Sequence, residues 1–306
     1  MKKIHFIITI IGICLTCCHS SESKKVVSRN SPNVTINQPE DNGDNTEEKD
    51  SVTGFTPTED SLRREYLAEG IRCIVNNDAK GFASHCAYPI IRKRPLHDIE
   101  DSVSMVKYFN ILFDDYAKNK LKNKSAKDWT NMGCNGYALD LAPENLDFGT
   151  FWDGNYEGAI TAVNYSSKAE QALRQKMIAK DKASLHPSLR GKWIFDYCFK
   201  CPNGYTVRID APEGVEPALG NRYRMLIFFK GTSLKAKPNI IMYGTYETTG
   251  SAGNKLYTFK DKKNKAEFQY NYMIGGDMHF QEFTLKGHIN YNSHQLKFFY
   301  WDDIVK

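Results

Sequence analysis

The sequence of 306 residues lacks the short motifs that mark common catalytic sites. It contains no H-E-x-x-H of zinc proteases, no G-x-S-x-G of serine hydrolases and no Walker phosphate loop. The glycine-rich stretch at residues 250–254 does not stand between a strand and a helix, so it predicts a flexible turn without a nucleotide role. No enzyme class can therefore be assigned from motifs.

Metal-ligand spacing is missing as well. Cys198 and Cys201 form a lone C-x2-C, and a zinc site would need two further ligands at suitable spacing. The surrounding residues predict strand, turn and strand, whereas a redox C-x2-C opens a helix, so we expect either a structural disulfide or two buried thiols. His279, His288 and His294 match neither a helical nor a hairpin metal site. We expect no metal and no cofactor.

Charge of one sign is not in large excess. The chain has 41 Lys and Arg against 36 Asp and Glu, and after residue 60 the balance is 35 against 27, or about +8. This is too mild to predict a nucleic-acid partner. The basic clusters at residues 118–127 and 174–182 predict solvated surfaces, with contact to anionic headgroups or acidic envelope polymers as the alternative.

The long apolar run lies at the N-terminus, in MKKIHFIITIIGICLTCC. A basic start and a short apolar core predict a signal peptide over residues 1–17, and the run is short for a membrane span. With Leu15 at position −3, Cys18 resembles the acylated cysteine of a bacterial lipoprotein. Cys17, with Cys14 at −3, is the alternative, and a cleaved signal without lipid is another. The resemblance implies palmitate-type chains and attachment to a bacterial membrane, the outer membrane by preference, on its periplasmic or surface face.

Residues 18–60 have the composition of a tether. They are rich in Ser, Asn, Asp, Glu, Thr and Pro and have no hydrophobic period, and from His19 onward they hold four basic residues against nine acids. Such a segment cannot bury enough apolar area to offset its chain entropy, so we expect a disordered spacer. Asp-Ser-Val and Asp-Ser-Leu, at Ser51 and Ser61, resemble the O-glycosylation acceptor of Bacteroidetes.

Residues 61–187 predict a mixed α and β domain. Helical periodicity covers residues 61–75, 79–85 and 102–118, strand-like runs cover 136–141, 149–153 and 159–165, and a polar helix covers 168–184. This order resembles the NTF2-like (SnoaL-like) cone, in which a curved sheet wraps around helices and leaves a pocket. The strings YPIIRKRPLHDI and FNILFDDYAKN resemble uncharacterised exported proteins of Bacteroidetes, a resemblance that supplies no catalytic residues.

Residues 188–306 predict an all-β domain, because the pattern changes to period two with Gly, Pro and Asn turns. About eight short strands at 10–15-residue spacing favour an antiparallel barrel or sandwich. Together with the preceding mixed domain, this gives α+β as the expected fold class. The expected strands cover residues 193–200, 205–210, 222–229, 239–247, 256–261, 266–273, 280–286 and 296–301.

Candidate functional residues in the expected cone are those that could supply acid–base chemistry in an apolar pocket. They are His85, His97, Asp98, Tyr137 and Asp140, with Trp129 and Trp152 as pocket walls. In the β domain, Phe268, Tyr270 and Tyr272 share one face of a strand, where core packing is expected and an aromatic binding platform is the alternative.

Three functions are compatible with this sequence. The preferred one is a lipid-anchored envelope binding protein whose partner is an envelope protein, a glycan or a polymer; an inhibitor or immunity protein is one version. The second is a small-molecule enzyme with an Asp/His acid–base pair in the cone. The third is a structural component of the envelope.

Overall fold

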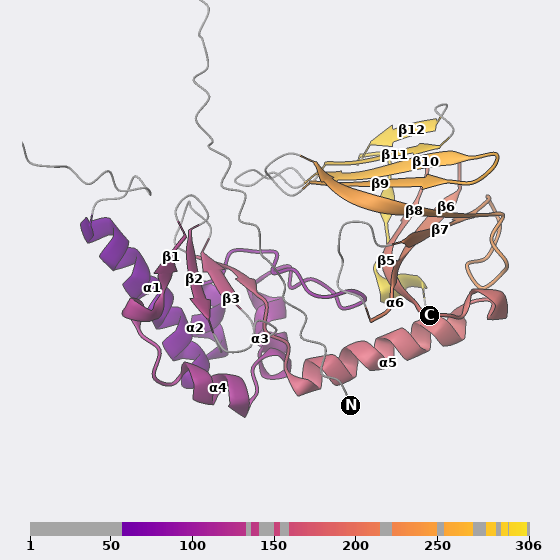
Figure 1. The fold of residues 1–306 in the computed structure, drawn as a ribbon. Helices are drawn as coiled ribbons and strands as arrows, with labels where there is room; N and C mark the ends of the chain where they lie inside the picture. The colour runs from indigo at the N-terminus through magenta and orange to yellow at the C-terminus, as the bar shows by residue number, and fades with distance from the viewer. Residues whose placement is uncertain are drawn as a thin grey trace, which may run out of the picture. The chain divides into compact units, whose positions relative to one another are not determined.

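The computed structural model describes residues 57–132, 136–140, 150–153, 159–214, 222–249, 254–271, 280–285, 289–292 and 294–304. Within the chain, Asp50–Lys306 forms a compact unit by itself (Figure 1). The expected signal peptide, both candidate acylation sites (Cys17 and Cys18) and Ser51 lie outside the described residues, as does all of the expected tether before residue 57.

Four helices form the first part of this unit, which we call the head. Asp78, Asp101 and Asp114 each accept a hydrogen bond from a backbone N–H of the first turn and so begin α2, α3 and α4. The helices are α1 (Pro57–Val75), α2 (Ala79–Ser84), α3 (Ser102–Leu112) and α4 (Asp115–Leu121). The expected helix over residues 102–118 is thus two helices, because Phe113 is extended and Asp114 caps a new one.

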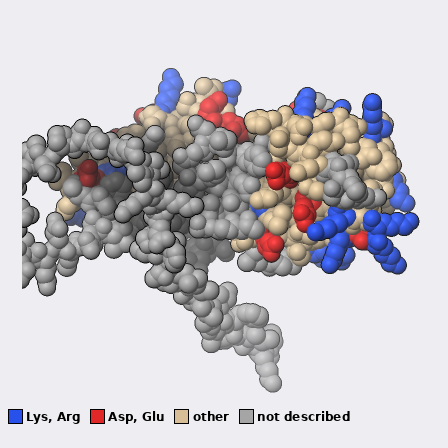
Figure 2. Space-filling view, turned by 90° about the horizontal axis from the view of Figure 1, so that it is seen from above, with Lys and Arg blue, Asp and Glu red and all other residues tan. Residues whose placement is uncertain are grey.

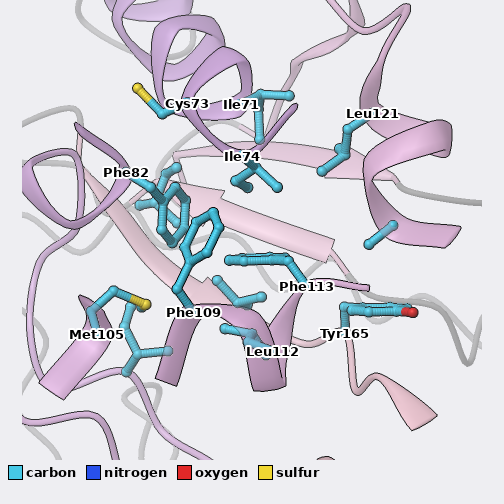
Figure 3. Close-up of a cluster of buried hydrophobic side chains, with 14 of the residues drawn as sticks. Ile71, Cys73, Ile74, Phe82, Met105, Phe109, Leu112, Phe113, Leu121 and Tyr165 are labelled. Carbon is cyan, nitrogen blue, oxygen red and sulfur yellow. The ribbon is translucent and has the colours of Figure 1, made fainter. Parts of the chain in front are cut away.

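The helices pack on a small antiparallel sheet in the order β1-β2-β3-β4. Its strands are β1 (Thr130–Asn131), β2 (Tyr137–Asp140), β3 (Thr150–Asp153) and β4 (Ile160–Val163). The interior of the head is filled by side chains of all four helices and of β2 and β4. Phe82, Phe109 and Phe113 form its aromatic centre, with ring centroids 5.0–6.0 Å apart (Figure 3).

The second part is a single antiparallel sheet of nine strands, in the order β12-β11-β10-β9-β8-β7-β6-β5-β13. Figure 1 shows that this sheet curls strongly into a half-barrel. The strands are β5 (Trp193–Lys200), β6 (Thr206–Pro212), β7 (Tyr223–Phe228), β8 (Ile240–Thr249), β9 (Asn254–Lys260), β10 (Lys265–Asn271), β11 (Phe280–Leu285), β12 (Ile289–Asn292) and β13 (Lys297–Phe298).

Aromatic side chains fill the concave face of the sheet. Phe199 on β5 stacks on Phe268 of β10 at 5.1 Å between ring centroids, although four strands lie between them in the sheet. Such a contact requires the sheet to curl back on itself. Gly244 allows β8 and β9 to approach closely at one point, because a Cβ there would lie 1.8 Å from the carbonyl oxygen of Thr258.

Helix α5 (Lys168–Ser184) joins the two parts, and its buried residues include two acids. Glu170 receives two hydrogen bonds from the guanidinium of Arg92 in the head, at 2.7 and 2.5 Å. Asp181 receives two from Arg208 of β6, at 2.8 and 2.6 Å. The two acids are eleven residues apart, about three helical turns, so they lie on one face of α5.

The network at Asp181 continues along the convex face of the sheet. Asp210 accepts a hydrogen bond from Arg208 Nε at 2.6 Å, and two from Arg224 of β7. All four side chains are at most 4% exposed. Two arginines and two aspartates thus form a neutral buried cluster that holds α5 against the sheet.

The expected α+β class is confirmed, and the boundaries of most predicted strands agree with the structure to within a few residues. The expected strand at residues 296–301 is wrong in its second half, because β13 is only Lys297–Phe298 and helix α6 (Trp301–Ile304) follows. Helix α1 begins at Pro57, before the expected start near Ser61. Two apolar residues inside the expected helices, Leu62 and Val103, are 67% and 60% exposed. Strand β12 is an element that the sequence pattern did not indicate.

Candidate functional site

A cavity of about 740 Å³ lies where the head meets one end of the curled sheet. The head contributes the loop at residues 91–94 together with Thr161, Ala162 and Asn164, and α5 contributes Arg174. The sheet contributes residues 194–197 of β5, Tyr223 of β7, and Lys255 and Tyr257 of β9. A cavity of this size accommodates a small molecule.

A β-bulge in β5 brings Asp196 into this cavity. The pairing of β5 with β6 shifts register between Phe195 and Tyr197, which makes Asp196 the extra residue of the strand. Phe195 packs in the cluster with Trp301, whereas Tyr197 packs in the concave core. Asp196 faces the same side as Tyr197, since the hydroxyl of Tyr257 donates to its Oδ2 at 3.3 Å. The bulge thus re-aims a carboxylate that strict alternation would place on the other face.

The carboxyl group of Asp196 has an unusual electrostatic environment. Burial raises its pKa from 3.8 to about 6, although the positive charges of Lys255 and Arg94 and the hydrogen bond from Tyr257 oppose this rise. No ion pair of Asp196 is found within the described part of the chain. The group therefore changes its charge close to neutral pH.

Two cations border the carboxylate. Arg94 donates from Nη2 to Asp98 at 2.9 Å, and its backbone carbonyl accepts from Arg174 Nε at 2.8 Å. Burial lowers the pKa of Arg94, but Asp98 outweighs this and raises it, so the guanidinium stays charged. Lys255 Nζ lies 5.8 Å from the ring centroid of Tyr246. Both cations face the cavity, where they can contact an anionic group.

Neutral phenols surround Asp196. Burial raises the pKa of Tyr197, Tyr223 and Tyr257 above the usual value of 10, and the charge of Asp196 raises all three further. These tyrosines therefore remain protonated and can donate or accept hydrogen bonds. The site combines a titrating acid, two fixed cations and hydroxyl groups on aromatic walls.

A second cavity of about 280 Å³ adjoins the first and shares Arg94 and residues 195–197 with it. Its other walls include Tyr270 and residues 298–301. The ring of Tyr300 lies 4.5 Å from that of His97, and its hydroxyl donates to Glu100 Oε1 at 2.5 Å. These contacts hold the segment after β13 against the head loop beside the site.

The candidate residues of the head fall into two groups. Asp98 supports the cavity indirectly, because it accepts from the Arg92 backbone and from the Arg94 guanidinium, and His97 is near it in the same loop. The others are elsewhere: His85 Nδ1 is 2.7 Å from the carbonyl of Gly81, and Tyr137 donates to Asp60. The structure therefore brings no Asp/His pair from the predicted set into one pocket.

The remaining candidates have structural positions. Trp129 is 1% exposed in the core of the head, and Asp140 is exposed at the end of β2. Phe268 is fully buried in the concave core, and Tyr270 packs against that core. Trp152 belongs to β3, but its side chain lies outside the described residues, as does Tyr272.

Cys198 and Cys201 are both buried free thiols, the second of the two expected arrangements. Cys198 packs in the cluster with Trp301, and Cys201 packs in the concave core. Burial raises the pKa of each thiol to about 12, so neither is an activated nucleophile. Across the described ranges, no three His, Cys, Asp or Glu side chains are grouped as a metal site would require.

Sequence reasoning missed Asp196, Lys255 and Tyr257. The available signal was a lone Asp inside the strand WIFDYCFK, where an acid interrupts aromatic and apolar residues. The bulge that turns Asp196 toward the cavity depends on the pairing of β5 with β6, which no local pattern in the sequence indicates.

Comparison of the chain with protein-family models, curated proteins and solved structures found no match. Among the described residues, no helix has the length and apolar character required to cross a membrane.

Proposed function

We propose that the protein is a binding protein of the cell envelope and that its ligand occupies the cavity around Asp196. The observation that carries this proposal is the 740 Å³ cavity with Asp196 at its wall and Arg94 and Lys255 beside it. Asp196, Arg94 and Lys255 all line this cavity, so an acid and two cations can contact the same ligand.

The lining favours a small hydroxylated ligand with an acidic group, such as an acidic sugar. Arg94 and Lys255 are suited to a carboxylate or phosphate, Asp196 and the phenols to hydroxyl groups, and the aromatic rings to an apolar sugar face. A glycan partner of the envelope meets this description more closely than a protein partner does.

The proposed location rests on the N-terminal sequence. Leu15 and Cys18 have the spacing of a lipoprotein signal, and two or more acyl chains suffice for stable anchoring. The acidic residues that follow provide a spacer between the membrane and the folded unit. An inhibitor, an immunity protein and a structural component remain alternative roles for such a protein.

Isothermal titration calorimetry with a panel of acidic and neutral sugars tests the binding role. We expect acidic sugars to bind more tightly than neutral ones, and Lys255→Gln to weaken that binding about tenfold, since a charge-assisted hydrogen bond contributes roughly 1.5–3 kcal/mol. Lys260→Gln is the matched control on the same strand, because Lys260 is exposed at its other end. Equal losses from both variants, or no acidic ligand in the panel, would contradict the proposal.

An enzyme is the second candidate, with Asp196 as its general acid or base. Its pKa of about 6 is suited to proton transfer near neutral pH. This proposal moves the acid–base chemistry from the expected cone to the sheet. Turnover of a bound sugar that disappears in Asp196→Asn, while binding survives, would support it; binding without turnover at any pH would exclude it for that ligand.

For the head we propose an NTF2-like fold. The support is the order of its elements, four helices followed by antiparallel strands that cover them. Its interior is packed with large side chains, which favours a structural role of the head in holding the loop at residues 91–94. An experimental structure in which the helices do not pack on the concave face of the four-stranded sheet would refute the assignment.

A further inference from the structure

The turns at one end of the curled sheet are rich in lysine. Neighbouring strands are antiparallel, so the β5–β6, β7–β8 and β9–β10 turns lie at the same end. We call this the lysine end. Figure 2 shows Lys and Arg side chains gathered there, on the right of the view. Its exposed lysines in and beside two of these turns are Lys230, Lys235, Lys237, Lys260, Lys262, Lys263 and Lys265.

Two further lysines extend this surface, since β13 pairs Lys297 with Lys200 at the end of β5, and both are exposed. Opposing charge is scarce. The described residues of the three turns include one acidic side chain, Asp261. Its carboxylate accepts hydrogen bonds from the backbone N–H groups of Lys263 and Asn264, both at 2.6 Å. Beside the β9–β10 turn, Lys265 pairs with Glu267 at 2.8 Å. Among the described residues of this end, lysines therefore outnumber acids.

An aromatic pair lies among these lysines. Phe229, the residue after β7, is 37% exposed. Its ring stacks on that of Tyr205 from the β5–β6 turn, with centroids 4.7 Å apart. An exposed aromatic ring within a basic surface is the arrangement found where proteins insert side chains at a membrane interface.

We propose that the lysine end docks on an anionic membrane surface through lipid headgroups. The lysines are spread over separate turns, and the described turns contain no arginine that could bind one phosphate with two hydrogen bonds. Ammonium groups distributed in this way fit a diffuse sheet of negative charge better than a specific polymer. This proposal depends neither on the ligand of the cavity nor on acylation of Cys18.

Docking in this way leaves the cavity accessible. Tyr223 and Lys255 stand at the beginnings of β7 and β9, and Asp196 lies near the beginning of β5, whereas the lysine end is formed where these strands finish. The two surfaces therefore occupy opposite ends of the same strands. A protein held by its lysine end can still bind a ligand between sheet and head.

Vesicle sedimentation tests the proposal with residues 19–306, which retain the whole compact unit and lack the apolar N-terminal segment. We expect binding to vesicles of phosphatidylglycerol and phosphatidylcholine but not to phosphatidylcholine alone. Binding should weaken strongly when salt is raised from 0.05 to 0.5 M, because the Debye length falls to roughly 5 Å and the lysines are then screened from the lipid headgroups.

The variant with Lys230, Lys237, Lys262 and Lys263 replaced by Gln should bind at least about tenfold more weakly, since each lysine near an anionic surface contributes to partitioning. The matched control replaces four exposed lysines of the head, at positions 80, 107, 122 and 127, and should bind like the parent. Thermal melting shows that both variants are folded.

Phe229→Ala, made in the parent protein, should reduce vesicle binding twofold or more. The salt dependence of binding should stay the same, because no charge is removed. Equal losses in the two lysine variants, salt-independent binding, or binding to an anionic polysaccharide but not to anionic vesicles would overturn the proposal.

Discussion

At the residue scale, Asp196 has a carboxyl group whose pKa is raised by burial, set among aromatic and apolar residues of β5. The raised pKa means that the carboxyl group of Asp196 binds its proton more tightly in the folded chain than in the unfolded one. The negative form of Asp196 therefore lowers the free energy of unfolding, a cost that an uncharged residue at this position would avoid. Such a cost is typical of residues kept for function.

The first prediction concerns this pKa. Between pH 4 and 6 the unfolded chain has released the proton and the folded chain retains it, so this residue makes stability fall as pH rises, until the slope flattens above pH 6. An asparagine at this position cannot titrate, so the Asp196→Asn variant does not lose this stability. The change in the free energy of unfolding caused by Asp196→Asn should therefore be more favourable at pH 8 than at pH 4, by up to about 3 kcal/mol. Urea unfolding at both pH values measures the difference. An effect independent of pH would show that Asp196 titrates normally.

At the scale of elements, α5 connects head and sheet through buried charges more than through an apolar stripe. Few of its side chains are buried, and these include Glu170 and Asp181, each bound by an arginine from a different part of the unit. The geometry is specific, because each guanidinium makes two hydrogen bonds to one carboxylate. The Arg92–Glu170 pair holds the head loop against α5, and the Arg208–Asp181 pair holds α5 against the sheet. Together they place the head loop beside β5, where the cavity lies.

The second prediction follows from the neutral cluster on the convex face. Asp181→Ala leaves one positive charge buried without compensation and should cost about 3–5 kcal/mol in the free energy of unfolding. Lys182→Gln is the control, because it breaks the more exposed Lys182–Glu213 pair, at 25% and 34% exposure, and should cost less than about 1 kcal/mol. Chemical denaturation followed by circular dichroism compares them. Similar costs would mean that the cluster does not hold α5.

At the scale of the whole molecule, the sheet has two ends of different chemistry. One end meets the head and encloses Asp196, and the other presents lysines and Phe229 to solvent. Proposed acylation at Cys18 and proposed docking of the lysine end would act on the same membrane. The proposed anchor would keep the protein close to the membrane, and the proposed docking of the lysine end would fix the orientation of the folded unit on the membrane surface.

Metabolic labelling with a palmitate analogue tests the anchor. The wild-type chain should be labelled and recovered in the membrane fraction of the expressing bacterium. Cys18→Ser should abolish the label, because the proposed lipid requires this thiol. Cys17→Ser is the control and should retain the label. Loss of label in Cys17→Ser alone would transfer the site to that residue.

The predictability of the fold differs between its two parts. Strand boundaries in the sheet could be predicted because alternation and turn residues are local signals, as in Trp193–Lys200, where the predicted and observed limits agree. The break between α3 and α4 could not, since Phe113 and Tyr116 continue an apolar pattern across a cap at Asp114. The head candidates His85 and Tyr137 had plausible chemistry, but their partners are local carbonyl and carboxylate groups.

The sequence by itself determined the α+β class, most strand positions, and the expectation of an exported chain, because composition and periodicity follow from neighbouring residues. Only the tertiary structure decided the site. Asp196 faces the cavity because a bulge forms when β5 pairs with β6, and Lys255 and Arg94 approach it from segments about 60 and 100 residues away in the chain. Such convergence arises from the curl of the sheet and the position of α5, which no local pattern encodes.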